Sequence, residues 1–207
     1  MQTRPAPRLE IETPSGVAWA DLYRVRSPRA LLMLGHGAGG SVQTPDLTAI
    51  TAAVTARGIA VALVTQPYRV AGKRAAPAAP RLDEAWIAVA AQLRRQRGWG
   101  RLPLVAGGRS SGARVACRTA TAIGAAAVVA LAFPLHPPGR PEKTRLDELA
   151  AVTVPVLVVQ GERDAFGRPP PAPGRQVRVI PGADHSLKKD PAAVAGAVLD
   201  FLQALPG

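Results

Sequence analysis

A serine with glycines two residues to either side lies near the middle of the chain, in the sequence Gly108-Arg109-Ser110-Ser111-Gly112. This G-x-S-x-G spacing follows a short apolar run and precedes a segment of small residues, which is the strand–turn–helix setting of a nucleophile elbow. The outer glycines are needed because a β-carbon there would collide with the neighbouring strand or helix. Such a turn strains the serine backbone and presents the hydroxyl at the carboxyl edge of the sheet. We therefore predict that Ser110 is a nucleophile.

A serine hydroxyl is a weak nucleophile and needs a base that is oriented by a third group. His185 lies in a turn between the last predicted strand and the C-terminal helix, and Asp164 follows the strand before that. The carboxyl ends of parallel strands meet at one edge of a sheet, so these side chains should lie beside Ser110. The predicted roles are His185 as the base and Asp164 as the acid.

A glycine-rich segment follows an early apolar run and supplies the fourth part of the predicted site. Glycines let the backbone turn its N–H groups inward, and the oxyanion of a tetrahedral intermediate needs such donors. We predict an oxyanion hole from the N–H groups of Ala38 (or Gly39) and Ser111, with Gly37 and Gly39 also lining the substrate site. A phosphate-binding loop is the rival interpretation, but G-x-G-x-x-G would require glycine where the chain has Val42.

Four further residues have types or positions that suggest a role. Arg109 and Arg114 flank the nucleophile and could either attract an anionic substrate or hold the fold through an ion pair. His136 follows another predicted strand at the same edge and could line the pocket, although its proline neighbours favour a structural role. Cys117 falls inside a predicted helix, which favours a small buried thiol over a nucleophile. Three scattered histidines and one cysteine have no ligand-like spacing, so neither a metal nor an organic cofactor is predicted.

The elements that must position these residues follow an alternating pattern. Short apolar runs alternate with helix-like segments, which favours an α/β fold: a mostly parallel sheet with helices on both faces, in one domain over residues 1–207. The predicted buried strands are residues 30–34, 59–65, 103–106, 126–132, 154–160 and 176–180. Residues 9–13 and 17–25 predict an antiparallel hairpin before them.

Helix signals fill the gaps between the strands. Thr44-Pro45-Asp46 predicts a capped helix to about residue 56, and Asp190 begins a second, with an apolar stripe to residue 205. Apolar residues at helical spacing over residues 82–93 predict another. Residues 70–80 and 166–175 are predicted to be irregular because they are rich in proline or in small and charged residues.

The chain is strongly basic, with 26 Lys and Arg against 14 Asp and Glu, a formal net charge of +12. A nucleic-acid partner is one explanation, but the arginines are scattered along the chain, which favours solvated faces instead. The first twelve residues contain no apolar stretch that could act as a signal peptide, and no run suits a membrane span. We expect a cytoplasmic protein that does not bind membranes.

Five segments together resemble one family. They are HGAGG at 36–40, GGRSSGAR at 107–114, FPLHPPG at 133–139, QGERDAFG at 160–167 and ADHS at 183–186. The chain resembles, over about residues 30–205, the compact α/β-hydrolases often labelled dienelactone-hydrolase-like. That group includes testis-expressed relatives and the hydrolase-like domain of a subunit of a nuclear acetyltransferase complex. The resemblance implies an α/β-hydrolase fold and the same roles for Ser110, Asp164 and His185. True dienelactone hydrolases carry a cysteine nucleophile instead.

The predicted function is a serine hydrolase that cleaves an ester or thioester through an acyl-enzyme on Ser110. The segment between Leu135 and Thr153 is too short for a lid domain, so we expect an open site and a small or surface-presented substrate. The alternative is a catalytically silent α/β-hydrolase fold that serves as an interaction module, since the relatives include a domain of a larger complex. A polyanion-binding protein is a third possibility, which no basic patch interleaved with aromatic residues supports.

Overall fold

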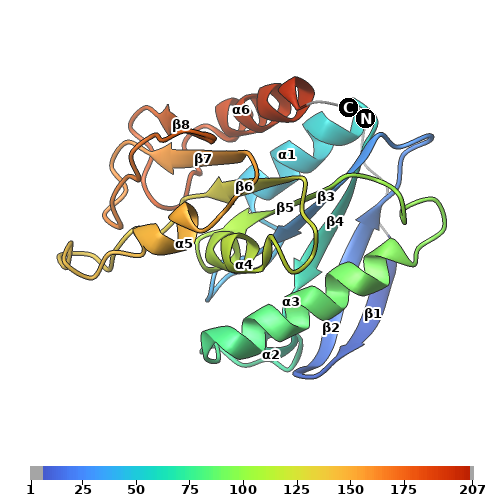
Figure 1. The fold of residues 1–207 in the computed structure, drawn as a ribbon. Coiled ribbons are helices and arrows are strands. Elements are labelled where there is room, and N and C mark those ends of the chain that lie inside the picture. The colour runs from blue at the N-terminus through green and yellow to red at the C-terminus, as the bar shows by residue number, and fades with distance from the viewer. Residues whose placement is uncertain (1–6, 206–207) are drawn as a thin grey trace.

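The computed structural model describes residues 7–205, and the strands within them form one eight-stranded sheet (Figure 1). The strand order is β1-β2-β4-β3-β5-β6-β7-β8. The strands are β1 (Arg8–Thr13), β2 (Gly16–Tyr23), β3 (Ala30–Gly35), β4 (Ile59–Thr65), β5 (Leu104–Arg109), β6 (Ala127–Leu131), β7 (Val156–Gly161) and β8 (Arg175–Ile180). The hairpin β1–β2 is antiparallel and joins β4 in antiparallel register, whereas β3 to β8 are parallel.

All the predicted strands are confirmed, with their ends displaced by at most three residues. The largest displacement is in β5, which continues to Arg109 because the Ser110 N–H still donates to the carbonyl oxygen of Leu131 at 2.9 Å. The Val- and Leu-rich central strands are buried on both faces, as expected for parallel strands covered by helices. The carboxyl ends of β3 to β7 therefore meet at one edge, and β5 leads directly into the nucleophile.

Helices cover both faces of the sheet (Figure 1). Helices α1 (Pro45–Thr55) and α6 (Pro191–Ala204) pack together on one face, and α3 (Ala79–Arg94) and α4 (Ser111–Thr119) pack together on the other. The core is accordingly divided into two apolar layers by the sheet. Trp86 and Phe133 belong to the layer under α3 and α4, whereas Leu47 and Val198 belong to the layer under α1 and α6.

Some local expectations need correction. Thr44 is the residue before α1, but its hydroxyl makes no capping hydrogen bond. Asp190 does cap α6, because its Oδ1 accepts the Ala193 N–H at 2.9 Å. The segment 70–80 is not wholly irregular: the short helix α2 (Pro67–Val70) ends at its first residue, and α3 begins within it. Helices α2 and α5 (Leu146–Ala150) were not predicted because four or five residues are too few to show a helical periodicity.

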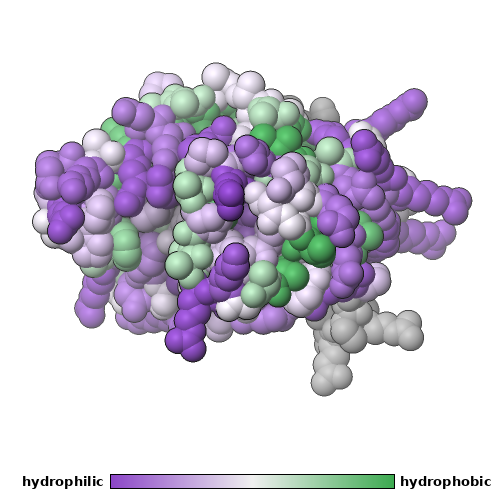
Figure 2. All heavy atoms as spheres, turned by 90° about the horizontal axis from the view of Figure 1, so that it is seen from below, coloured by the Kyte–Doolittle hydropathy of each residue, from purple (hydrophilic) through white to green (hydrophobic). Residues whose placement is uncertain are grey.

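Some basic side chains lie on a hydrophilic surface, and others form ion pairs between helices. Hydrophilic side chains cover most of the face seen from below, and apolar side chains form separate small groups on it (Figure 2). Arg114 pairs with Glu148 of α5, and Arg118 pairs with both Glu148 and Asp83 of α3. These arginines thus hold three helices together. Within residues 7–205, no helix has the length and apolar character needed to cross a bilayer.

Candidate active site

The backbone at Ser110 has the strained geometry expected of a nucleophile elbow. Ser110 connects β5 to α4 with φ 53° and ψ −110°, a left-handed value of φ that serine rarely adopts. A β-carbon added at Gly108 would lie 2.8 Å from the carbonyl oxygen of Gly35. A β-carbon added at Gly112 would lie 2.8 Å from the carbonyl carbon of Gly35. The expected need for glycine at both positions is therefore confirmed: strand, turn and helix approach each other too closely for a side chain.

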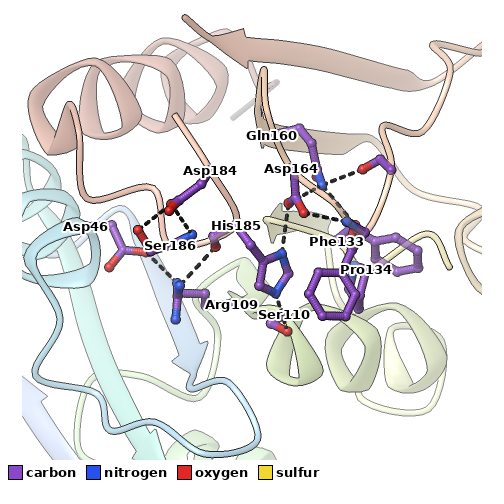
Figure 3. A network of polar contacts seen from close by, with 12 residues as sticks. Asp46, Arg109, Ser110, Phe133, Pro134, Gln160, Asp164, Asp184, His185 and Ser186 are labelled. Atoms are coloured by element: carbon purple, nitrogen blue, oxygen red, sulfur yellow. Dashed lines mark hydrogen bonds and ion pairs between the residues drawn. The ribbon is translucent and has the colours of Figure 1, made fainter. Parts of the chain in front are cut away.

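The three predicted triad residues lie in one hydrogen-bonded chain (Figure 3). Nε2 of His185 lies 2.9 Å from Oγ of Ser110, and its Nδ1 lies 2.8 Å from Oδ2 of Asp164. Asp164 can only accept when ionised, so Nδ1 carries the proton and Nε2 is free to accept the serine hydroxyl proton. Three segments that are far apart in the sequence thus bring the predicted nucleophile, base and acid together at the predicted edge.

The carboxylate of Asp164 is buried and fully directed by its neighbours. Its Oδ1 accepts the Phe166 N–H at 2.9 Å, and its Oδ2 accepts from Nε2 of Gln160 at 2.7 Å as well as from His185. Gln160 is completely buried at the end of β7, and the same amide nitrogen lies 2.8 Å from the carbonyl oxygen of Gly167. From the sequence, Gln160 is predicted at the end of a strand and in a segment of the family resemblance, without a role in the site. A polar residue ending a run of buried valines was the signal that could have identified it.

The phenyl ring of Phe166 also packs against the imidazole of His185, with 4.2 Å between ring centroids. The turn that carries His185 approaches β7 closely, because a β-carbon at Gly161 would lie 2.5 Å from the carbonyl oxygen of Ala183. In the same turn, hydrogen bonds from the hydroxyl and the N–H of Ser186 lower the pKa of Asp184. His185 is therefore held by packing as well as by Asp164.

The glycine-rich loop after β3 is anchored by two side chains that sequence reasoning did not assign. Nε2 of His36 accepts the N–H of Gln66 at 3.1 Å, so Nδ1 carries the proton and donates to the carbonyl oxygen of Gly37 at 2.7 Å. Burial lowers the pKa of His36, which favours this neutral form. The hydroxyl of Tyr68 donates to the carbonyl oxygen of Ala38 at 2.5 Å. These contacts orient the two peptide groups that flank Ala38, whose N–H is the predicted oxyanion donor.

The predicted oxyanion and substrate residues occupy distinct places around Ser110. Ser111 is the first residue of α4, so its N–H belongs to the first turn, where a helix has free donors. A β-carbon at Gly37 would lie 3.5 Å from Cβ of Ser110, which places this glycine directly against the nucleophile. At Gly39 a β-carbon would have no neighbour within 4 Å, so this glycine faces open space.

The two arginines beside the nucleophile both form ion pairs. Nε of Arg109 lies 3.4 Å from Oδ2 of Asp46, and its Nη2–H donates to the backbone carbonyl oxygen of His185 at 2.9 Å (Figure 3). Arg114 contacts Glu148 of α5 through two nitrogens, at 2.8 and 2.5 Å. Of the two roles considered for these arginines, the structure therefore favours the ion pair over attraction of an anionic substrate.

Comparison with known proteins agrees with this geometry. Residues 28–196 match the model of a protein family described as "Alpha/beta hydrolase domain". The chain belongs to the α/β-hydrolase family. The resemblance seen in the sequence is thereby confirmed. A search of curated proteins finds no match to this α/β-hydrolase.

Solved structures share its fold at low sequence identity. A dienelactone hydrolase from Anabaena variabilis superposes with a TM-score of 0.77 at 17% identity, covering 99% of this chain and 100% of the other. An α/β serine hydrolase without lid from Xanthomonas campestris gives 0.73 at 22% identity, covering 100% and 98%. Est1E from Butyrivibrio proteoclasticus gives 0.75 at 16% identity, covering 95% of this chain and 97% of the other. These likenesses establish the fold and leave the chemistry to be argued from the site.

The remaining candidates of this α/β-hydrolase have local contacts of their own. Nδ1 of His136 lies 2.9 Å from the carbonyl oxygen of Pro137. The backbone N–H of His136 donates to the carbonyl oxygen of Phe166 at 3.0 Å. His136 thus ties the loop after β6 to the loop of the acid. Cys117 is buried in α4, which confirms the expected buried thiol, and burial raises its pKa to about 12. Among residues 7–205, no cluster of His, Cys, Asp and Glu side chains is arranged to hold a metal ion.

Proposed function

We propose that this α/β-hydrolase is a serine hydrolase that cleaves an ester or thioester through an acyl-enzyme on Ser110. The observation that carries the proposal is the continuous chain of contacts from Oγ of Ser110 through His185 to Asp164, at 2.9 and 2.8 Å. Family membership supports hydrolysis, and the structural neighbours include Est1E, one structure of which has ferulic acid bound. A small-molecule ester is the substrate class that these neighbours favour.

In the first half of the reaction, Oγ of Ser110 attacks the carbonyl carbon of the substrate while Nε2 of His185 takes the hydroxyl proton. The carbonyl π electrons move onto oxygen, and the N–H groups of Ala38 and Ser111 would donate to that oxyanion. Each such donor contributes about 10²–10³ in rate. The intermediate collapses when the alcohol or thiol leaves, and His185 returns the proton to it. Asp164 stabilises the imidazolium throughout.

In the second half, water replaces the leaving group and the same residues act again. Nε2 of His185 takes a proton from water, whose oxygen attacks the acyl carbon bound to Ser110. Collapse of the second intermediate restores the serine hydroxyl and releases the acid. Between β6 and β7 the described chain carries only the five-residue helix α5, so a small or surface-presented ester could reach Ser110 directly.

The proposal is tested with a fluorophosphonate probe, which labels an activated serine. We expect labelling of the wild type, and loss of labelling in Ser110→Ala and His185→Ala. Ser15→Ala, in the hairpin turn between β1 and β2, is the control and should be labelled like the wild type. Hydrolysis of p-nitrophenyl esters and of an acyl thioester should fall by about 10⁴-fold or more in the two triad variants.

A folded wild type that is neither labelled nor active on any ester or thioester would contradict the proposal. The fold would then serve as a catalytically silent interaction module. Circular dichroism of each variant separates loss of chemistry from loss of folding.

A further inference from the structure

Arg109 connects three parts of the site that belong to different elements. It is the last residue of β5, next to the nucleophile, and its Nη2–H reaches the backbone carbonyl oxygen of His185 at 2.9 Å. Its Nη1 would lie 3.7 Å from a β-carbon at Gly37, so the guanidinium also lies beside the oxyanion loop. In Figure 3 it lies between Asp46 and the segment of the base. One side chain thus contacts the surroundings of the nucleophile, the base and the oxyanion donor.

The partner of Arg109 is an unusual carboxylate. Asp46 is completely buried in the first turn of α1, and neither of its oxygens accepts a hydrogen bond from any residue that the structure describes. An ionised carboxylate in such a place is costly unless an opposite charge lies close by. Arg109, with Nε at 3.4 Å and only 15% of its side chain exposed, supplies that charge. The pair fixes the guanidinium because moving it would leave Asp46 uncompensated.

We propose that Arg109, held by Asp46, is a positioning residue that sets the backbone of His185 relative to Ser110. The inference rests on the proposed function, because it assigns a task within that mechanism. His185 is fixed at two ends: its ring by Asp164, which follows β7, and its carbonyl by Arg109 of β5. Arg109 immediately precedes Ser110 at the end of β5, so the same strand positions both the base and the nucleophile. This arrangement maintains the 2.9 Å contact between His185 and Ser110.

An alternative task for Arg109 is recognition of an anionic substrate. Its position opposes that role, since Nε faces Asp46 and Nη2 is committed to the carbonyl oxygen of His185. The charge of Asp46 also offsets the field that a substrate anion would experience. The two tasks predict different kinetics: positioning affects kcat for every ester, whereas recognition affects KM for anionic esters alone.

The experiment compares Arg109→Met, Arg109→Lys, Asp46→Asn and the double variant with both Asp46→Asn and Arg109→Met. We expect Arg109→Met to lower kcat for a neutral p-nitrophenyl ester by about 10–100-fold with KM little changed, since small displacements of a catalytic group cost this much. Arg109→Lys, which can still donate to the carbonyl, should recover part of kcat. The double variant removes the unpaired buried carboxylate and should fold well, yet keep the low kcat of Arg109→Met.

Arg114→Met is the matched control. Arg114 also flanks the nucleophile and loses an ion pair when mutated, but its partner is Glu148 of α5, whereas Arg109 contacts Asp46 and the carbonyl oxygen of His185. Its kcat should stay within about 2-fold of the wild type. A second readout needs no substrate: the downfield proton resonance of Nδ1–H of His185, assigned by its absence in His185→Ala. It should shift or broaden in Arg109→Met and remain unchanged in Arg114→Met.

Wild-type kcat and an unchanged resonance in the double variant would overturn the positioning role and leave the proposed function intact. A KM increase in Arg109→Met restricted to an anionic ester, with kcat retained, would overturn it in favour of substrate recognition. If the wild type hydrolyses no ester while the resonance still depends on Arg109, the proposed function fails and the positioning of His185 is supported.

Discussion

Replacement of Gly112 by alanine tests how closely the helix behind the nucleophile approaches the sheet. Gly112 is the second residue of α4, and a β-carbon there would lie 2.8 Å from the carbonyl carbon of Gly35 and 2.8 Å from the carbonyl oxygen of His36. Contacts between carbon atoms are optimal at about 3.5–4.0 Å. Both neighbours are backbone atoms at the start of the oxyanion loop, so the helix and this loop would have to separate.

The sign of the effect follows from two opposing terms. Alanine is favoured over glycine within a helix by up to about 1 kcal/mol. Overpacking against neighbours that cannot rotate away costs about 1–3 kcal/mol, and the backbone contacts here place Gly112 in the upper part of that range. We therefore expect Gly112→Ala to lower the free energy of unfolding by about 1–2 kcal/mol. Gly196→Ala in α6, where a β-carbon has no neighbour within 4 Å, should instead raise it by up to about 1 kcal/mol.

Urea unfolding followed by circular dichroism measures both variants against the wild type. The same chemical change should move the midpoint in opposite directions, with the slope unchanged. Gly112→Ala should also lower kcat for ester hydrolysis, because the displaced atoms lead into the loop of Ala38, whereas Gly196→Ala should not. A Gly112→Ala variant as stable as Gly196→Ala would refute the close approach of α4 to β3 on which the account of the elbow depends.

Two titratable side chains give further predictions. Burial lowers the pKa of His36 below 6.5, so near that pH the unfolded chain binds the proton more readily. The free energy of unfolding should then fall from about pH 7 to about pH 5, at most by about 1.4 kcal/mol per pH unit from this residue. His36→Gln should show a shallower fall in urea titrations, and an identical slope would contradict the argument. Because burial raises the pKa of Cys117 to about 12, iodoacetamide at about pH 8 should label the unfolded chain only; rapid labelling of the native protein would oppose this.

The strands and the positions of the three predicted triad side chains could be predicted because their signals are local. Buried parallel strands are short apolar runs, and the end of each run marks the edge at which Ser110, Asp164 and His185 meet. The elbow adds a steric signal, since its glycines are demanded by the turn itself. Even the end of β5 was misplaced only because its last residues, Gly107 to Arg109, are glycines and an arginine. Such residues disfavour a strand in isolation and are held in one by their neighbours.

The residues that support the site could not be predicted because their roles depend on burial and on partners distant in the sequence. In the sequence, Gln160 is the end of a predicted strand, and Asp46 is an early carboxylate in the first turn of a predicted helix. In the folded chain Gln160 donates to the carboxylate of Asp164, and Arg109, 63 positions further along the sequence, supplies the charge that Asp46 needs. Tyr68 lies on a helix of four residues, which is too short to leave a pattern.

These supports have a common logic. His36, Asp46 and Gln160 are polar residues buried at the ends of strands or at the start of a helix, where a polar group must find a partner. Each partner belongs to a different part of the candidate site: the glycine-rich loop after β3 for His36, Arg109 and through it the backbone of His185 for Asp46, and the carboxylate of Asp164 for Gln160. The requirement to satisfy buried polar groups therefore also fixes the positions of the loops, which lack regular hydrogen bonding of their own. A short chain without a lid domain can in this way hold an ordered site at an open edge.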